Sequence, residues 1–157
     1  MKKTTLYLSI GALAFALHSC GGGSESAPEA TAEAPQSMYA DKKVETDPMK
    51  NKGIGPVTSV ELGEEVDAAM AEEGRLIYEE KCSACHKPTE RYIGPAPKGI
   101  FDRRTPEWVM NMILNPEEMV ANDPIAKDLL KEYLSPMANQ SLTEDQARKI
   151  LEYFRTL

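Results

Sequence analysis

Two cysteines and a histidine stand close together in the middle of this sequence, in the order Cys82-Ser83-Ala84-Cys85-His86. Side chains three residues apart on a helical turn project from one face, so both thiols can reach a single ligand. This spacing suits two thioether bonds to the vinyl groups of one haem, with the neighbouring imidazole beneath the iron. The pattern therefore predicts one covalent haem c, attached at Cys82 and Cys85, with His86 as an axial ligand.

Three other interpretations of this motif compete with haem attachment. A zinc site needs about four ligands, and the sequence has no second Cys/His pair to complete the set. A thioredoxin-like redox pair needs a strand before it and a helix after it, whereas here a helical pattern precedes and loop residues follow. A structural disulfide between Cys82 and Cys85 would leave His86 without a role. The five-residue pattern favours haem over all three.

Length and composition limit the class of protein. The 157 residues allow one domain of ordinary size. Three cysteines are too few for a disulfide scaffold. The 25 acidic residues outnumber the 18 basic ones, which argues against nucleic acid as a partner.

The N-terminal segment has the pattern of an export signal. Two lysines precede an apolar run over residues 6–17, which is too short to span a bilayer. The run ends just before Cys20, and the segment resembles a bacterial lipoprotein signal. That resemblance implies a signal peptide at 1–19, a lipid anchor on Cys20, and a periplasm-facing, membrane-anchored protein. Ordinary cleavage after Ala16, which would leave a free Cys20 thiol, is the alternative.

The chain between the signal and the domain falls into two parts. Residues 20–46 are rich in Glu, Ala, Pro and Ser and hold few large apolar side chains, so we expect a disordered tether. A flexible chain of this length reaches roughly 28 Å on average. Residues 47–62 regain glycine and β-branched residues, and we expect an ordered extension that packs on the domain at 63–157.

Helical patterns follow residue 63. A first helix is predicted over 65–81, with one apolar stripe made of Val66, Met70, Gly74, Ile77 and Tyr78. Further helix starts are marked by an N-cap residue followed by proline, at Thr105-Pro106, Asn115-Pro116 and Asp123-Pro124. The helix from Pro124 is expected to end at Ser135-Pro136 and to bury Ile125, Leu129, Leu130, Tyr133 and Leu134. A capping box at Thr143–Gln146 opens the last helix, and no strand-period run is present, so the predicted fold is all-α.

Residues 63–157 resemble a class I c-type cytochrome, a small all-α domain around one haem with His/Met ligation. Gly74 and Tyr78 match the glycine and aromatic that this family places against its C-terminal helix, where the facing candidates are Ile150, Tyr153 and Phe154. Gly94-Pro95 matches the Gly-Pro that follows the haem motif in the family. The resemblance implies that the Pro95 carbonyl accepts a hydrogen bond from His86 Nδ1.

The second axial ligand cannot be another histidine of the same chain. His18 leaves with the signal, so the residues alone allow methionine, another weak donor or an open position. The family keeps its methionine in the loop before the last helix, and the resemblance implies that Met137 is this ligand. Trp108, Tyr92 and Tyr133 are expected as walls of the haem pocket or donors to its propionates.

Ligation by histidine and methionine implies electron transfer and no enzymatic activity. A thioether favours ferrous iron, and two filled axial positions leave no site for substrate. Two alternatives stay open at this point: a haem enzyme or gas-binding protein with an open distal site, and a fixed redox subunit of a larger complex.

Charge and resemblance together suggest the redox partners. Eight acidic residues and one arginine lie between 61 and 80, whereas basic residues predominate between 81 and 104. We expect this basic segment to border the haem edge and to steer it to an acidic patch on a partner. The stretches 47–57 and 94–116 look similar to small cytochromes associated with nitrous oxide reductase. The expected partners are a membrane donor complex and a periplasmic reductase or terminal oxidase, served by a monomeric domain.

Overall fold

The computed structural model describes residues 44–157. All described residues fall in one compact unit. The predicted signal peptide at 1–19, the lipidation site Cys20 and nearly all of the tether at 20–46 lie outside the described residues.

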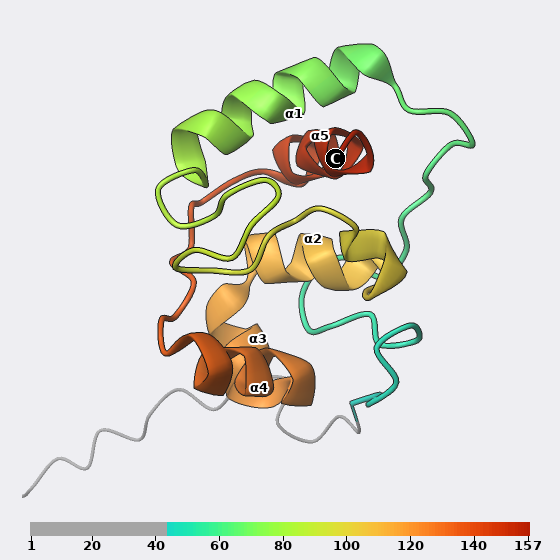
Figure 1. The fold of residues 1–157 in the computed structure, drawn as a ribbon. Helices are drawn as coiled ribbons and strands as arrows, with labels where there is room; N and C mark the ends of the chain where they lie inside the picture. Colours follow the sequence, from blue (N-terminus) through green and yellow to red (C-terminus); the bar gives the residue numbers. More distant parts are fainter. Residues whose placement is uncertain (1–43) are drawn as a thin grey trace, which may run out of the picture. The chain divides into compact units, whose positions relative to one another are not determined.

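The described part of the chain contains five α-helices and one short 3-10 helix and no strand, which confirms the predicted all-α fold (Figure 1). None of its helices is long and apolar enough to cross a membrane. In chain order the elements are α1 Ala68–Lys81, η1 Ile100–Asp102, α2 Pro106–Leu114, α3 Pro116–Asn122, α4 Pro124–Tyr133 and α5 Glu144–Arg155.

Helices α1 and α5 cross in close contact (Figure 1). Gly74 makes this approach possible, because a Cβ atom there would overlap the Lys149 carbonyl and the Ile150 amide nitrogen. One turn later the Tyr78 ring fills the crossing, with its centroid 5.2 Å from that of Tyr153 and 5.8 Å from that of Phe154. The contact between Gly74, Tyr78 and the C-terminal helix that the sequence predicts is therefore present.

The segment before α1 packs on α2 and α3 through buried side chains. Ile54 and Val57 are 4% and 7% exposed and belong to the same apolar cluster as Trp108 and Met119. The Asn111 side chain accepts a hydrogen bond from the Val57 amide at 3.0 Å and donates to the Val57 carbonyl at 2.8 Å. The buried Asn111 amide thus satisfies both backbone groups of Val57, as a neighbouring strand would do.

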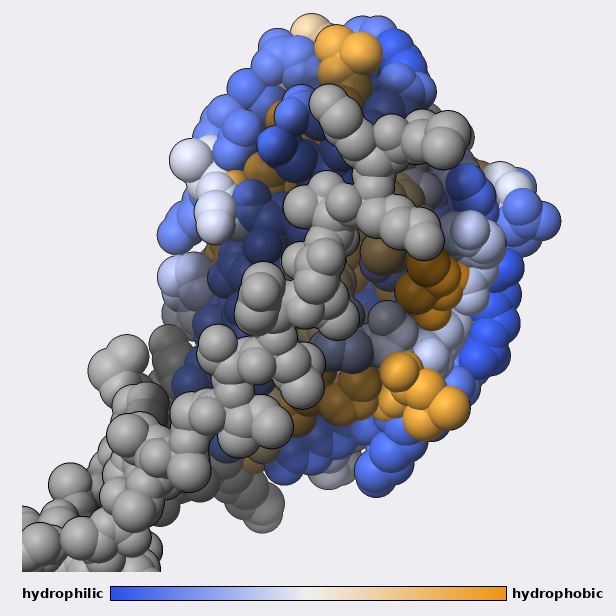
Figure 2. Space-filling model, turned by 90° about the vertical axis from the view of Figure 1, so that its left-hand side faces the viewer, coloured by the Kyte–Doolittle hydropathy of each residue, from blue (hydrophilic) through white to orange (hydrophobic). Residues whose placement is uncertain are grey.

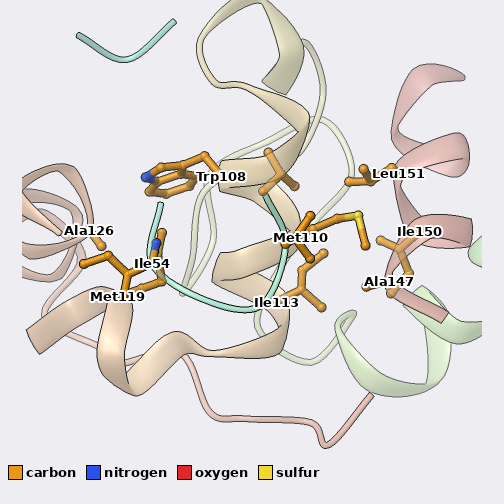
Figure 3. Close-up of a cluster of buried hydrophobic side chains, with 11 residues drawn as sticks. Ile54, Trp108, Met110, Ile113, Met119, Ala126, Ala147, Ile150 and Leu151 are labelled. Atoms are coloured by element: carbon orange, nitrogen blue, oxygen red, sulfur yellow. The ribbon is translucent and has the colours of Figure 1, made fainter. Parts of the chain in front are cut away.

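The core connects this segment to both long helices. Figure 3 shows Ile113 and Met110 of α2 between Ile54 and Met119 on one side and α5 on the other, with the Trp108 ring over Ile54. Ala147, Ile150 and Leu151 of α5 are fully buried in this cluster. Helix α2 presents apolar residues to both of its neighbours, so it packs between the segment before α1 and helix α5.

Two predicted core residues are exposed instead, and both lie at helix ends. Asp67 caps α1 through its carboxylate, so the helix begins at Ala68 and Val66 stays outside it, 37% exposed. Leu134 was expected in the core, but it has a φ of 55° as the C-cap of α4 and is 84% exposed. The following Ser135-Pro136 cannot continue the helix, and the left-handed turn directs the Leu134 side chain to solvent.

Asn115 is the N-cap residue of α3 and the helix begins at Pro116, as predicted. The Asn115 side chain makes no capping hydrogen bond and donates to the Ile54 carbonyl at 3.2 Å. A long-range contact with the preceding segment thus replaces the local cap. The side chains of Thr105, Asp123 and Thr143 do cap their helices.

Candidate functional site

The Cys-x-x-Cys-His motif continues the last turn of α1. The Cys82 amide donates to the Tyr78 carbonyl at 2.9 Å, and the His86 amide donates to the Cys82 carbonyl at 2.9 Å. These hydrogen bonds keep the motif coiled, so both cysteines line one cavity of about 560 Å³. A cavity of this volume lies within the range of small-molecule and cofactor sites.

His86 is held from three directions. Its Nδ1 lies 2.8 Å from the Pro95 carbonyl oxygen, as expected from the sequence. A carbonyl only accepts, so Nδ1 carries the hydrogen and Nε2 keeps its lone pair for a metal. Gly94 leaves room for the ring, because a Cβ atom there would overlap the imidazole. The Tyr78 hydroxyl donates to the His86 carbonyl at 2.8 Å, and burial raises the pKa of this phenol, which therefore stays a donor.

The cavity walls are mainly apolar and come from α2, α4 and the loops around them. His86 and Met137 both line this cavity, together with Trp108 and Tyr133. Met137 comes from the loop between α4 and α5 and is partly buried against the core. A second methionine, Met112 of α2, lines the cavity as well.

Tyr92 does not line this cavity, so its predicted place in the pocket wall is corrected. Its ring is 53% exposed, with the Lys87 ammonium 5.0 Å from the ring centroid. The Tyr92 amide donates to the Gly94 carbonyl at 3.1 Å, in a tight turn on the outside of the loop. The spacing of residues along a loop does not reveal which side chains face the cavity. The exposure of Tyr92 depends on its turn with Gly94.

One cation points into the site with an unused donor. Arg104 lines the cavity, and its guanidinium lies 5.2 Å from the centroid of the Trp108 ring. Its Nε is buried and has no hydrogen-bond partner among the described residues. Burial and, after it, the neighbouring charge of Arg103 lower the pKa of Arg104. Because Arg104 lines the cavity, its guanidinium would pair with a carboxylate bound there.

The donors present therefore fit a haem better than the alternatives. Two thiols, an imidazole with a free Nε2, apolar walls and a cation for a propionate face one cavity. Burial raises the pKa of the Cys82 thiol to about 11, whereas the reactive thiol of a thioredoxin-like pair has a lowered pKa. No group of three or more Cys, His, Asp or Glu residues in 44–157 is arranged to hold a metal ion, as a zinc site would need.

Comparison with known proteins agrees with this chemistry. Residues 71–157 match the cytochrome c family. The chain belongs to the cytochrome c family. A solved cytochrome c from Rhodothermus marinus is 45% identical with a TM-score of 0.67, and the match covers 70% of this chain and 96% of that one. No curated protein sequence matches significantly.

Two engineered forms of the Rhodothermus marinus cytochrome c are similar as well. One is 45% identical with a TM-score of 0.63, covering 65% of this chain and 89% of that one. The other, bound to a carbene intermediate, is 46% identical with a TM-score of 0.60, covering 65% and 88%. The family carries covalently attached haem c, and this cytochrome c is a haem-based electron carrier.

Sequence reasoning missed the inward role of Arg104. The sequence pattern places both Arg103 and Arg104 in the basic segment that we expect at the docking surface. Only the fold shows that the two side chains lie in different environments. Arg103 is exposed and donates to the Ala96 carbonyl at 3.0 Å, whereas Arg104 is half-buried over Trp108. The proline that begins α2 lies two residues later, and no local signal marks which arginine turns inward.

Replacing Tyr78 with phenylalanine tests the support of His86. The variant leaves the His86 carbonyl without its donor in a buried position, so we expect the free energy of unfolding to fall by about 1 kcal/mol. Denaturant titration of the haem-loaded protein measures it. The matched control is Tyr92→Phe, which removes the hydroxyl of the exposed tyrosine and should cost less than about 0.5 kcal/mol. Equal losses in the two variants would contradict the assigned contact.

Proposed function

We propose that this cytochrome c carries single electrons, with its haem attached at Cys82 and Cys85 and ligated by His86 and Met137. The observation that carries the proposal is that these four side chains line one cavity. When bound, the haem iron gains and releases one electron. The protein's part is to orient the imidazole through Pro95, to exclude water with apolar walls, and to keep both axial positions filled.

The choice of Met137 over Met112 rests on where each residue lies. Both residues line the cavity, but Met112 lies within α2. Other side chains of this helix, Trp108 and Ile113, form part of the core. Met137 stands on a loop between helices, as the ligand of a class I cytochrome does. A thioether from Met137 would stabilise ferrous iron and raise the reduction potential.

Two volume-conserving variants distinguish the methionines. Met137→Leu should abolish the methionine-to-ferric-iron charge-transfer band, lower the reduction potential by on the order of 0.1 V or more, and allow rapid binding of carbon monoxide or cyanide. Met112→Leu is the matched control, since it replaces a thioether on the same cavity wall, and it should keep the band. Loss of the band in Met112→Leu alone would assign the ligand to Met112.

A haem with an open axial position is the second candidate. It is favoured by the structural neighbour bound to a carbene intermediate, although that protein is engineered. The same ligand-binding assay separates the two functions, because the electron carrier should resist carbon monoxide and cyanide while the open-site protein binds them at once.

The mouth of the cavity supports docking to an acidic partner. Lys81, Arg91 and Arg103 line the cavity and are exposed, and Ile93 lines it while remaining 43% exposed. On the face shown in Figure 2, hydrophobic side chains reach the surface between hydrophilic ones. We expect the partner to present carboxylates around an apolar centre. A membrane donor complex and a periplasmic reductase, such as nitrous oxide reductase, or a terminal oxidase are the proposed partners.

Charge reversal at the cavity mouth tests this docking surface. Lys81→Glu should slow association with the physiological partner about threefold at low ionic strength, and the difference should fade as salt is added. The control is Lys50→Glu, which makes the same charge change at another exposed ion pair outside the cavity. Stopped-flow electron transfer measures both. Equal effects, or rates that ignore ionic strength, would argue against steering at this surface.

We also propose that a lipid on Cys20 ties the domain to a membrane on the periplasmic side. The support is the sequence signal before Cys20 and the tether that follows it. In the native host, Cys20→Ser should move the haem-loaded protein from the membrane fraction to the soluble one, while a high-salt wash leaves the unaltered protein in place. Retention of the variant as part of a larger assembly would instead indicate a fixed subunit.

A further inference from the structure

Asp123 is a fully buried carboxylate whose hydrogen-bond partners are all donors. Its Oδ1 accepts from the Trp108 indole at 3.3 Å and from the Ala126 amide at 2.8 Å, and its Oδ2 accepts from the Asn51 side chain at 2.6 Å. Its exposed fraction is 0%. Among residues 44–157 no lysine, arginine or histidine forms a salt bridge with it.

These contacts require the ionised form. A protonated carboxyl group would need an acceptor for its own hydrogen, and none of the three partners offers one. The Asn51 amide cannot turn over to provide one, because its Oδ1 already accepts from the Gly53 amide at 2.7 Å. Asp123 is therefore a negative charge held by neutral donors.

This charge lies directly behind the wall of the haem cavity. Two of its three partners, Trp108 and Ala126, line that cavity, and Figure 3 shows the indole nitrogen pointing toward the side on which Ala126 lies. The Arg104 guanidinium, which lies 5.2 Å from the centroid of the Trp108 ring, interacts electrostatically with Asp123. Because Asp123 is fully buried, salt and solvent screen its charge weakly.

Helix capping does not require a charge at this position. Asp123 is the N-cap of α4, but asparagine and serine cap helices about as well without a negative charge. The indole likewise needs only an acceptor. Burying an unpaired anion costs free energy that an uncharged cap would avoid. A haem held at Cys82 and Cys85 would occupy the cavity that the Trp108 indole lines.

We propose that Asp123 is a positioning residue that orients Trp108 and, through its fixed negative charge, lowers the reduction potential of the haem. Ferric haem carries one positive charge more than ferrous haem, so a nearby anion stabilises the oxidised state. The electron that reduces the iron comes from the redox partner. The segment before α1 contributes through Asn51, which holds the carboxylate in place. The inference rests on the one-electron function proposed above.

Redox titration of the matured, haem-loaded protein tests the charge. Asp123→Asn keeps the cap and the size of the side chain and removes the charge, but its new amide group faces the Asn51 amide without an acceptor. At a fixed ambient potential we expect the ratio of reduced to oxidised protein to rise roughly three- to tenfold, and tenfold corresponds to about 59 mV for one electron. Asp123→Ser, a second uncharged cap, should shift the ratio in the same direction and serves where the asparagine variant fails to mature.

The sign of the shift separates this role from a structural one. A merely loosened pocket admits water, which stabilises the more charged ferric state and lowers the ratio. Asp128→Asn is the matched control, since it removes an exposed carboxylate from α4, and it should change the ratio less than about 1.5-fold.

An unchanged or lowered ratio in both Asp123 variants overturns the inference. A wild-type protein that shows no reversible one-electron couple would instead refute the proposed function, so the two failures are distinguishable.

Discussion

The close crossing of α1 and α5 is the constraint on which the site depends. Because Gly74 carries no side chain, the backbone of α1 rests on the Lys149 carbonyl, and Tyr78 one turn later packs against Tyr153 and Phe154. This contact fixes the end of α1, from which the haem motif continues without a break. The Tyr78 hydroxyl then reaches the His86 carbonyl. One residue thus connects the helix crossing to the axial ligand.

The opposite side of the cavity depends on α2 and on the segment that precedes α1. Trp108 and Arg104 face the cavity, while Asn111 holds the preceding segment by its backbone. Asn51 and Asp123 join across 72 residues of sequence. The extension therefore reaches the haem pocket through hydrogen bonds to buried groups, and it belongs to the folded domain as much as the helices do.

Local signals predicted the helices well, because each cap and each proline acts on its own neighbours. Thr105, Asp123 and Thr143 cap the helices that they were expected to begin. The His86 contact with Pro95 followed from the family resemblance. Two side chains differ from expectation. The Asn115 side chain donates to the distant Ile54 carbonyl and makes no capping hydrogen bond, and Tyr92 is exposed at a turn within its own loop. The sequence did not indicate that Arg104 lines the cavity or that the Asp123 carboxylate is fully buried, since both depend on how distant segments pack.

The central claim is that one haem is bonded covalently to this chain. Mass spectrometry of the protein matured in its own export pathway, denatured and extracted with acidified organic solvent, tests it most directly. We expect the haem to stay with the protein, on a peptide that contains Cys82 and Cys85, through two thioether bonds. A colourless chain, or a haem that the solvent removes while both thiols remain free or bonded to each other, would contradict it.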